Sequence, residues 1–440
     1  MFDPLYTAEE MRAAEAGHDV EALMERAGAA VAAEVLRRFP DARRIAVVCG
    51  GGANGGDGRI AARVLREEGR EAVETTAVED ADLVLDALFG TGFHDAPRAD
   101  AAALIERINV SGVPVLAVDV PSGVDASTGE VPGAAVRAAA TVAFHGRKVG
   151  LAVAPGRFHA GEVVVADIGL TSGTTQQALV TEAVLDRVPR RGPADSKYTA
   201  GSVLVVGGAP GLTGAVCLAA EAAFRADAGY VVVAVPEASL PVVETRLLEA
   251  VKLPWERVAD AAGRLGAIAI GPGLGRDDAA ARTRDELLAL GGHALVLDAD
   301  ALHGLEPGDW GPRAVLTPHA GELARLLGEP SEWVDAHRLE AARRGAERFG
   351  AVCLLKGADT IVAAPGKLLL VCDSGSPGLA TAGTGDVLTG VVAAFLAKGL
   401  EPQLAAAAAA TAHGLAARSL PQPGLIASDV VAALPAVLSR

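Results

Sequence analysis

A glycine-rich stretch that contains two polar side chains is the first place where this sequence could do chemistry. Residues 49–58 read CGGGANGGDG and follow the apolar run RIAVV, so Asn54 and Asp57 come shortly after a predicted strand. Glycines let backbone amides approach a ligand closely, and side-chain oxygens can bind a cation beside it. The stretch is not a GxxxxGK[ST] phosphate loop, because no lysine follows the glycines. Taken alone, it is also compatible with a tight turn.

Two other predicted strand ends carry oxygen-bearing side chains. Asp86 lies in DALFGTGF, and Asp119 and Ser122 lie in DVPSGVD. In an open parallel sheet, ligands bind beyond the carboxyl ends of the strands. Together with Asn54, these residues could hold a phosphate and a hard cation at one edge of a sheet, which weakens the explanation of the glycines as a simple turn.

A second cluster lies near the C-terminus, where GLATAGTGDVLTG places Gly383, Thr384 and Gly385 at the start of a predicted helix. The free amides of a helix N-terminus bind anions. Asp386, in the first turn, could be a general base that takes a proton from a substrate hydroxyl while the amides hold a transferring phosphoryl group. Asp386 could also simply complement the helix dipole.

Two further residues have a suggestive context in this half of the chain. Lys356 opens KGADT, which ends a predicted strand and is placed to hold nucleotide phosphate, although the lysine alone could be a surface charge. His319, in LTPHAGELARL, follows a strand and precedes a helix, where a helix-start or core hydrogen-bonding role is equally compatible. The remaining histidines show no metal-ligand spacing, so we assign them nothing.

The elements that position these residues follow from hydrophobic patterning. The apolar runs IAVVCG, LVLDALFG, VPVLAVDVPSG and ATVAFHG alternate with helical segments such as residues 59–68. This alternation is typical of a parallel sheet covered by helices on both faces. Ahead of it, Thr7 and Glu10 form a capping-box pattern, and apolar residues from Val20 to Val35 keep helical spacing. Together they predict two helices before the first strand.

The length and the change of pattern along the chain predict two domains. A chain of 440 residues is too long for one ordinary core. The pattern weakens between Leu170 and Lys197, through TSGTTQQ and VPRRGPADSKYTAG, and a second βα series begins at SVLVVGG. We therefore predict two three-layer α/β domains, over residues 1–190 and 196–440.

Composition narrows the class of partner and the compartment. The formal net charge of −16 would repel nucleic acid and anionic lipid, so we expect neither as a partner. Four widely spaced cysteines predict free thiols in a reducing cytoplasm, and no apolar stretch is long enough for a membrane span. Small molecules are the expected ligands, and we expect a homo-oligomer.

The motifs together resemble one family, the bifunctional nicotinamide-nucleotide repair enzymes, in which NAD(P)H-hydrate epimerase is fused to ADP-dependent NAD(P)H-hydrate dehydratase. LYTAEEMRAAE, LMERAG, GGANGGDG, DALFGTG, DVPSGVDASTGE and HGRKVGL are similar to the epimerase blocks, in order. GPGLG, LDADAL, LTPHAGEL, KGADT and AGTGDVLTG are similar to the dehydratase branch of the ribokinase-like fold. The resemblance implies a Rossmann-like epimerase domain followed by a ribokinase-like dehydratase domain.

For the epimerase, the resemblance implies two substrate-binding segments and a potassium ion. It implies Asn54, Asp86 and Ser122 as potassium ligands and Asp119 as the acidic group near the substrate. The family usually has an asparagine where this chain has Ala53, so a side-chain hydrogen bond from that position is lost while backbone contacts remain possible. The implied substrate-binding residues are Ala53, Asn54, Gly55, Gly56, Asp57, Gly90, Thr91, Gly92, Phe93, His94, Asp95 and Ala96.

For the dehydratase, the resemblance implies an ADP site next to a site for the hydrated coenzyme. Gly273, His319 and Asp386 would contact the coenzyme. Kinases of this fold usually need Mg²⁺ to neutralise phosphate oxygens, so we expect it here, although no ligand motif in the sequence fixes it. The implied nucleotide-binding residues are Lys356, Gly357, Ala358, Asp359, Thr360 and Gly385.

These assignments give two mechanistic hypotheses. In the hydrated coenzyme a hydroxyl lies on the carbon next to the ring nitrogen, whose lone pair can expel it. Asp119 would shuttle a proton to and from that hydroxyl, so that water returns on either face and the R and S forms interconvert. Asp386 would activate the hydroxyl of the S form for attack on the terminal phosphoryl of ADP, which gives AMP, and loss of phosphate would restore NAD(P)H.

Two alternatives remain at this stage. One is a ribokinase-like kinase of a vitamin precursor or sugar, because the GTGD chemistry is shared. The other is a non-catalytic binding or scaffolding role for the first domain, which the joint presence of Asn54, Asp86, Asp119 and Ser122 disfavours.

Overall fold

The computed structural model describes residues 1–171, 173–263, 265–308, 310–311 and 313–439. By its contacts the chain divides into two compact units. The N-terminal unit is Pro4–Ala178, and the C-terminal unit is Leu179–Arg440 together with Met1–Asp3. This division concerns packing; the assignment of functions to residues 1–190 and 196–440 stays a prediction.

The N-terminal unit contains a six-stranded sheet in the order β3-β2-β4-β5-β6-β8, in which every neighbouring pair is parallel. The apolar runs predicted as strands are confirmed. The strands are β2 Arg44–Cys49, β3 Glu71–Glu74, β4 Leu83–Ala87, β5 Val115–Val118, β6 Ala140–Phe144 and β8 Glu162–Ala166. Because all pairs are parallel, the carboxyl ends of these strands meet at one edge of the sheet.

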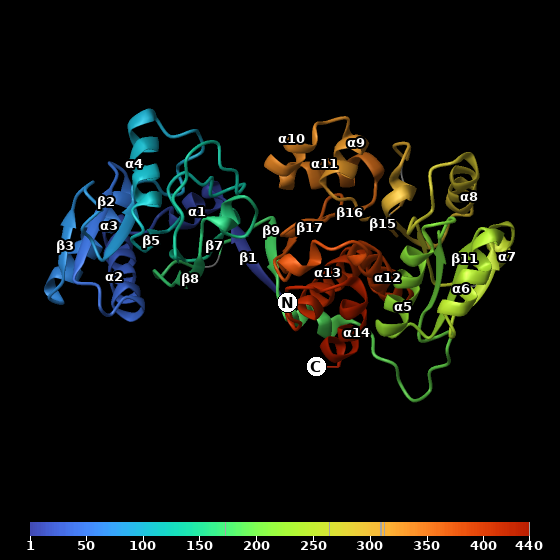
Figure 1. Ribbon diagram of the computed structural model, residues 1–440. Helices are drawn as coiled ribbons and strands as arrows, with labels where there is room; N and C mark the ends of the chain where they lie inside the picture. The colour runs from blue at the N-terminus through green and yellow to red at the C-terminus, as the bar shows by residue number, and fades with distance from the viewer. Residues whose placement is uncertain (172, 264, 309, 312, 440) are drawn as a thin grey trace. The chain divides into compact units, whose positions relative to one another are not determined.

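Helices cover both faces of this sheet (Figure 1). Helices α2 (Val20–Arg38) and α3 (Ala53–Glu67) pack on the face that includes Val47 and Leu85, whereas α4 (Ala99–Val110) packs on the face that includes Val48 and Val84. The alternation of adjacent residues between two buried faces explains why these strands are apolar at every position. The predicted three-layer architecture is therefore present.

Helix α3 begins earlier than predicted. The sequence predicted a helix over 59–68, but α3 starts at Ala53, so the second half of the glycine-rich stretch forms its first turns. The low helix propensity of glycine is overridden here by close packing on the sheet, since a Cβ at Gly58 would lie 2.5 Å from the Cβ of Ala87.

The N-terminal segment also differs from the prediction. A strand, β1 (Phe2–Tyr6), precedes α1 (Ala8–Glu15) and pairs in parallel with β7 (Arg147–Lys148). This pairing joins residues far apart in the chain, so local periodicity did not reveal it. The capping box is confirmed: the Glu10 amide donates to Thr7 Oγ1 at 3.2 Å, and the Thr7 amide donates to Glu10 Oε2 at 2.8 Å. The remaining short elements of this part are η1 Val149–Leu151, η2 Gly156–Phe158 and β9 Gln177–Val180.

The C-terminal unit contains a larger mixed sheet, with the order β12-β11-β10-β13-β14-β15-β16-β17-β18. Pairing is parallel from β12 to β16 and antiparallel between β16, β17 and β18. KGADT therefore includes the turn of a hairpin. The strands are β10 Ser202–Val206, β11 Tyr230–Val235, β12 Val251–Pro254, β13 Ala267–Ile270, β14 Ala294–Leu297, β15 Ala314–Leu316, β16 Val352–Leu355, β17 Thr360–Ala363 and β18 Leu369–Cys372.

Two layers of helices enclose this sheet (Figure 1). One face packs against α7 (Val258–Ala262), α8 (Asp278–Ala289), α9 (Ala320–Leu327) and α11 (Arg338–Phe349). The other packs against α5 (Thr213–Arg225), α12 (Thr384–Ala397) and α13 (Pro402–Arg418), with α14 (Ala427–Leu438) against α5 and α13. The shorter helices are η3 Glu182–Arg187, η4 Glu237–Ser239, α6 Leu240–Arg246, η5 Trp255–Arg257, η6 Ala299–Leu302, α10 Ser331–Ala336 and η7 Pro377–Leu379.

Two whole-chain observations bear on the sequence predictions. All four cysteines are free, and three of them are buried. Over the described ranges, no helix combines the length and the apolar character that crossing a membrane would require.

Two candidate active sites at strand ends

The ends of β4 and β5 form a buried polar cluster in the N-terminal unit. Asp86 is fully buried, and its two oxygens accept hydrogen bonds from the Ser122 hydroxyl at 2.6 Å and the Ser122 amide at 2.8 Å. Burial raises the pKa of Asp86 to about 6, and the hydrogen bonds from Ser122 oppose that rise. The cluster therefore places a carboxylate and a hydroxyl at the carboxyl edge of the sheet, where the sequence predicted them.

Asn54 approaches the same cluster from the start of α3. Its side-chain amide donates to the Phe89 carbonyl at 2.9 Å, and the Phe89 amide donates to Ser122 Oγ at 2.8 Å. The three residues implied as potassium ligands are thus connected through Phe89. Oxygens of a carboxylate, a hydroxyl, an amide and a carbonyl suit a hard cation. Within the described ranges, no three His, Cys, Asp or Glu side chains are grouped to hold a metal, so a cation here would depend on this mixed oxygen set.

The first turn of α3 provides free backbone donors. Its N-cap, Gly52, offers no side-chain hydrogen bond, and helical bonding begins where the Gly56 amide donates to the Gly52 carbonyl at 3.2 Å. The amides of Ala53, Asn54 and Gly55 therefore lie at an uncapped helix start, where the helix dipole favours an anion.

The structure separates the roles of the glycines in this stretch. A Cβ at Gly55 would lie 2.0 Å from the Gly50 carbonyl oxygen, and one at Gly56 would lie 2.2 Å from Cε of Met24. Protein atoms therefore occupy the space next to Gly55 and Gly56, so this space is not open to a ligand. By contrast, a Cβ at Gly51 or Gly52 would meet nothing within 4 Å. The open side of the loop is therefore at Gly51 and Gly52.

Asp119 follows β5 in an unusual conformation. Its φ of 66° lies in the left-handed region, which non-glycine residues rarely adopt. Its carboxylate accepts a hydrogen bond from the Phe144 amide at 3.0 Å and forms an ion pair with Lys148. These contacts hold the side chain at the sheet edge, and such backbone strain is common at functional sites.

Lys148 was missed as a site residue by the sequence analysis. It is completely buried, and its ammonium group donates to the Phe144 carbonyl at 2.7 Å as well as to Asp119. HGRKVGL contained this lysine, but a basic residue in a two-residue strand gives no local signal of burial. A buried lysine beside a carboxylate at a strand end is a feature of functional sites.

Two other carboxyl groups lie in the same electrostatic environment. Asp57 is 7% exposed, and its Oδ1 is buried without a hydrogen-bond partner. Burial, reinforced by repulsion from Asp119 and Glu15, raises the pKa of Asp57 to about 8 despite the opposing charge of Lys148. Burial also raises the pKa of Glu15, with a further contribution from Asp119. The site therefore contains one ion-paired carboxylate and one carboxyl group that favours its protonated form.

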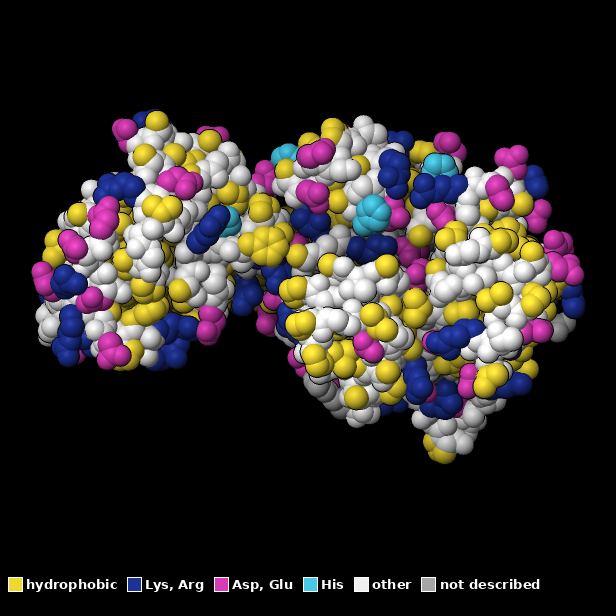
Figure 2. Space-filling view, viewed as in Figure 1, with side chains coloured by type: hydrophobic (Ala, Val, Ile, Leu, Met, Phe, Trp, Pro, Cys, Tyr) yellow, Lys and Arg dark blue, Asp and Glu magenta, His cyan; other side chains and the backbone are white. Residues whose placement is uncertain are grey.

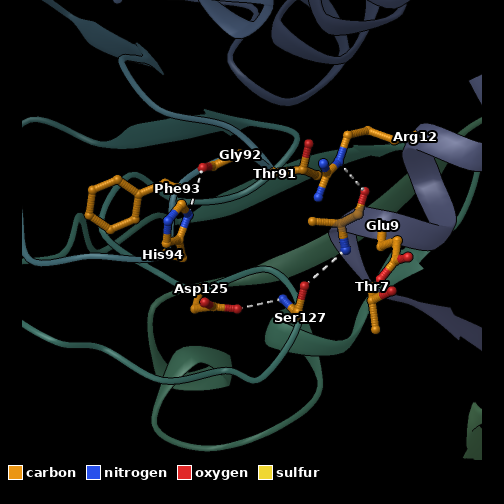
Figure 3. Close-up of a pocket in the computed structure, with 10 residues that line it drawn as sticks. Thr7, Glu9, Arg12, Thr91, Gly92, Phe93, His94, Asp125 and Ser127 are labelled. Atoms are coloured by element: carbon orange, nitrogen blue, oxygen red, sulfur yellow. Dashed lines mark hydrogen bonds between the residues drawn. The ribbon is translucent and has the colours of Figure 1, made fainter.

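The segment after β4 lines a cavity of about 500 Å³ (Figure 3). Thr91, Gly92, Phe93 and His94 form one side of it. The other side comes from α1 and the loop after β5, where the Ala8 amide donates to Ser127 Oγ at 2.9 Å. The side chain of Arg12 points toward Thr91 in Figure 3. Four of the seven residues from Gly90 to Ala96 thus border a space that can receive part of a ligand, and Asp95 and Ala96 follow them directly.

In the C-terminal unit, the predicted helix start is confirmed. Gly383 caps α12 with a φ of 89° and no side-chain cap, so the amides of Gly385 and Asp386 lie free in the first turn. Burial raises the pKa of Asp386 to about 7, with repulsion from Asp298 and Asp300 added and the charge of Lys356 opposing. A carboxylate with a pKa near neutrality beside an anion site has the properties of a general base.

Lys356 lies at the end of β16 and points toward the same place. Its ammonium group donates to Asp298 Oδ1 at 2.7 Å and lies 4.0 Å from Glu322. Burial lowers the pKa of Lys356, but the charges of Asp298 and Glu322 outweigh it and raise the pKa overall. The ammonium lies 3.5 Å from the position that a Cβ on Gly385 would take, so it stands over the start of α12.

The hairpin loop that begins at Lys356 is stabilised by hydrogen bonds from Arg338. The guanidinium of Arg338 donates to the Asp359 carbonyl at 2.7 Å and to Asp359 Oδ2 at 3.3 Å. Asp359 is fully buried, so its side chain shapes the loop. A Cβ at Gly357 would lie 2.3 Å from this guanidinium, which explains the glycine there. The loop backbone from Gly357 to Thr360 is thus fixed.

His319 and Gly273 have identifiable structural roles. His319 is the N-cap of α9, where its Nδ1 accepts a hydrogen bond from the Gly321 amide at 3.0 Å. Its side chain is 55% exposed, and Nε2 lies 3.4 Å from Glu322, which links it to the surroundings of Lys356. Gly273 has a φ of 59°, and its carbonyl accepts from the Ala209 amide at 2.7 Å, so it joins the ends of β13 and β10.

The surface around this second site is hollowed. Figure 2 shows basic, acidic and histidine side chains gathered in the hollow of the C-terminal unit below α9, α10 and α11. Taken together, the two units define an α/β enzyme with two sites, each of which combines an uncapped helix start, an aspartate of raised pKa and a lysine that is ion-paired with another aspartate.

Comparison with known proteins identifies the family of this two-site enzyme. A sequence profile described as NAD(P)H-hydrate dehydratase matches residues 203–434, and one described as YjeF-related protein N-terminus matches residues 20–81 and 70–150. The bifunctional NAD(P)H-hydrate repair enzyme Nnr of Moorella thermoacetica is 38% identical, over 94% of this chain and 92% of its own. The enzyme of the same name from Escherichia coli is 34% identical, over 95% of this chain and 89% of its own. The chain belongs to the family of bifunctional NAD(P)H-hydrate repair enzymes.

Solved structures support the fold of the C-terminal unit. The ADP/ATP-dependent NAD(P)H-hydrate dehydratase from Bacillus subtilis, co-crystallised with ATP and Mg²⁺, is 32% identical, with a TM-score of 0.55 over 59% of this chain and 96% of that chain. A ribokinase-like superfamily protein from Enterococcus faecalis is 26% identical, with a TM-score of 0.56 over 61% of this chain and 98% of that chain. The predicted ribokinase-like fold is therefore confirmed, and a vitamin-precursor kinase with a non-catalytic first domain is not supported.

Proposed function

We propose that this chain carries out both steps of NAD(P)H-hydrate repair, with the epimerase site in the N-terminal unit and an ADP-dependent dehydratase site in the C-terminal unit. The observation that carries the proposal is the occurrence of two separate strand-end sites in a chain that matches bifunctional relatives over 94% of its length. Each site contains an acid–base group beside a place for an anion. A single-function kinase would have no use for the first site.

In the proposed epimerase, Asp119 and Asp57 share the proton transfers. We assign Asp119, which is ion-paired with Lys148, the role of accepting a proton. Asp57, whose pKa is about 8, is suited to donate one to the departing hydroxyl. Departure of water leaves an iminium-like ring, and water returns on either face. The amides at the start of α3 and the residues from Gly90 to Ala96 would hold the dinucleotide.

A potassium ion would fit the cluster of Asn54, Asp86 and Ser122. The fit rests on the oxygen donors present and on the Phe89 carbonyl between them. When bound, the ion would neutralise negative charge close to a phosphate. Asn54 and Ser122 would then orient the loops after β4 and β5.

In the proposed dehydratase, Asp386 takes the proton of the substrate hydroxyl. The hydroxyl oxygen attacks the terminal phosphorus of ADP, the bond to the bridging oxygen breaks, and AMP leaves. The ring nitrogen then expels phosphate, and loss of a ring proton gives NAD(P)H. The amides of Gly385 and Asp386, with the ammonium of Lys356, stabilise the charge on the transferring group.

The choice of ADP rests on the resemblance, and Mg²⁺ would enter with the nucleotide. The carboxylates nearest to Lys356 are already occupied, because Asp298 accepts from Lys356, and Asp300 accepts from the Gly275 amide at 3.0 Å and pairs with Arg276. This arrangement fits an ion held chiefly by phosphate oxygens and water. Its chemistry would be neutralisation of phosphate charge.

The decisive test uses a mixed pool of both epimers of hydrated NADH. With ADP and Mg²⁺, we expect complete recovery of reduced-coenzyme absorbance and one AMP for each NADH formed. Rapid recovery of the S fraction alone would overturn the epimerase assignment. A chain that phosphorylates vitamin precursors with ATP and leaves the hydrates unchanged would overturn the whole proposal. Potassium removal should slow epimerisation and leave dehydration of the S form intact.

The remaining proposals concern the protein in the cell. We infer from the free cysteines that it works in a reducing cytoplasm. We also infer that it forms a homo-oligomer and binds neither nucleic acid nor membrane. Light scattering of the purified chain tests whether it forms a homo-oligomer. Co-sedimentation with DNA and with vesicles tests whether it binds nucleic acid or membrane.

A further inference from the structure

A buried aspartate that the proposed mechanism does not use lies behind Lys356. Asp298 directly follows β14 and is 1% exposed. Its Oδ1 accepts a hydrogen bond from Lys356 at 2.7 Å, and its Oδ2 accepts one from the Thr389 hydroxyl at 2.7 Å. Both side-chain oxygens are thus occupied, one by the end of β16 and the other by α12. The sequence analysis included Asp298 in LDADAL without giving it a role.

This arrangement fixes the lysine relative to the first turn of α12. Thr389 is fully buried and lies three residues after Asp386, so the two share one face of the helix. Asp298 therefore joins the lysine to the helix that carries the proposed base. A long lysine side chain would otherwise have many rotamers, and its ammonium would not stay over Gly385.

We propose that Asp298 is a positioning residue of the dehydratase, which holds the Lys356 ammonium over the start of α12 where the phosphoryl group transfers. This inference rests on the proposed dehydratase function. Asp298 does not touch the reacting atoms. It acts through Lys356, and Thr389 in turn fixes the orientation of the Asp298 carboxylate.

The same residue affects the charge balance around Asp386. The charged groups near the base are Asp298 and Asp300 after β14 and Lys356 after β16. Glu322 of α9 faces Lys356. Burial lowers the pKa of His413 of α13 to about 4, so this histidine, which also interacts electrostatically with Lys356, is neutral near pH 7. Removal of the Asp298 charge would remove a repulsion that raises the pKa of Asp386.

The test compares Asp298→Asn with Thr389→Val in the full chain. Asp298→Asn should lower kcat for ADP-dependent dehydration by about 10²-fold, because the ammonium is misplaced. It should also move the acidic limb of the pH profile of kcat to lower pH, because the repulsion that raises the pKa of Asp386 is removed. Thr389→Val removes one hydrogen bond and no charge, so it should lower kcat less and leave the acidic limb in place. The shift of the acidic limb reports loss of the Asp298 charge, and the loss of kcat in both variants reports the positioning of Lys356.

Two controls distinguish the possible failures. Asp227→Asn disrupts another Asp–Lys pair of this unit, in which Asp227 and Lys398 lie 2.6 Å apart, and should leave dehydration unchanged. The thermal unfolding of each variant reports whether the C-terminal unit, which contains all three substitutions, is folded. Wild-type kcat and pH profile in Asp298→Asn would overturn the inference, whereas failure of the wild-type chain to dehydrate the S form would overturn the proposed function. If Asp298→Asn does not fold, Thr389→Val decides: a lower kcat supports the inference, and an unchanged kcat overturns it.

Discussion

At the scale of single residues, the N-terminal site places two carboxyl groups in different surroundings. Asp119 is paired with a lysine that has no exposed surface, whereas Asp57 has a buried oxygen without a partner. One group thus has a charged partner, and the other, whose pKa burial raises to about 8, favours its neutral form. Pairs of carboxyl groups with such divergent surroundings are how enzymes obtain an acid and a base from the same residue type.

The raised pKa of Asp57 has a consequence for stability. Its pKa is about 8 in the folded chain against an ordinary value of 3.8, so the native state binds this proton more tightly than the unfolded state does. The stability that follows is complete below about pH 4 and is lost as pH rises through 8. We expect Asp57→Asn to raise Tm above pH 8 by roughly 2–4 °C or more, and to slow epimerisation about 10²-fold. Calorimetry at pH 5 and pH 9 checks this, and a lower Tm at pH 9 would contradict it.

Asp386 predicts the pH dependence of the second reaction. Because its pKa is about 7 and a general base must be ionised, kcat for dehydration should rise with pH through about 7 and then level off. Asp386→Asn should abolish most of this activity and the pH dependence with it. Stopped-flow measurement of NADH formation from the pure S form checks both. An acidic limb centred near pH 4 would show that the group is not desolvated as described.

At the scale of elements, the glycines at the start of α3 have different tolerances. Alanine at Gly55 would press on the Gly50 carbonyl, which is fixed backbone, whereas alanine at Gly56 would press on the end of the Met24 side chain, which can rotate away. We expect Gly55→Ala to destabilise the chain by roughly 1–3 kcal/mol and to impair epimerisation, and Gly56→Ala to retain both properties. Denaturant unfolding of the matched pair checks this; equal losses would contradict it.

The same elements show what could be predicted from sequence and why the rest could not. The runs that became β2, β4, β5 and β6 are apolar at nearly every position, and this alone indicated buried parallel strands with ligands at their ends. The early start of α3 was missed because glycine has low helix propensity, which packing on β2 and β4 overrides. Lys148 and Asp298 were missed because their burial and their partners depend on residues far away in the chain.

At the scale of the whole molecule, the two reactions use separate sets of residues. Asp119→Ala should therefore retain dehydration of the S form, and Asp386→Asn should retain epimerisation. We expect an equal mixture of the two variants to recover NADH completely from both epimers, because the S form can diffuse from one chain to another. Each variant alone should stall. Incomplete recovery by the mixture would indicate that the substrate must pass between the sites of one chain.

The pairing of the two lysines with aspartates affects how substrate arrives. Lys148 and Lys356 are each neutralised by an aspartate at contact distance, so neither projects an attractive field into solvent. The chain as a whole carries a formal charge of −16, and its coenzyme and nucleotide ligands are anions as well. Long-range forces then oppose the encounter, and dissolved salt weakens that opposition. Added potassium chloride should accordingly speed capture of dilute substrate, which is the reverse of the behaviour of enzymes that steer anions with an open basic surface.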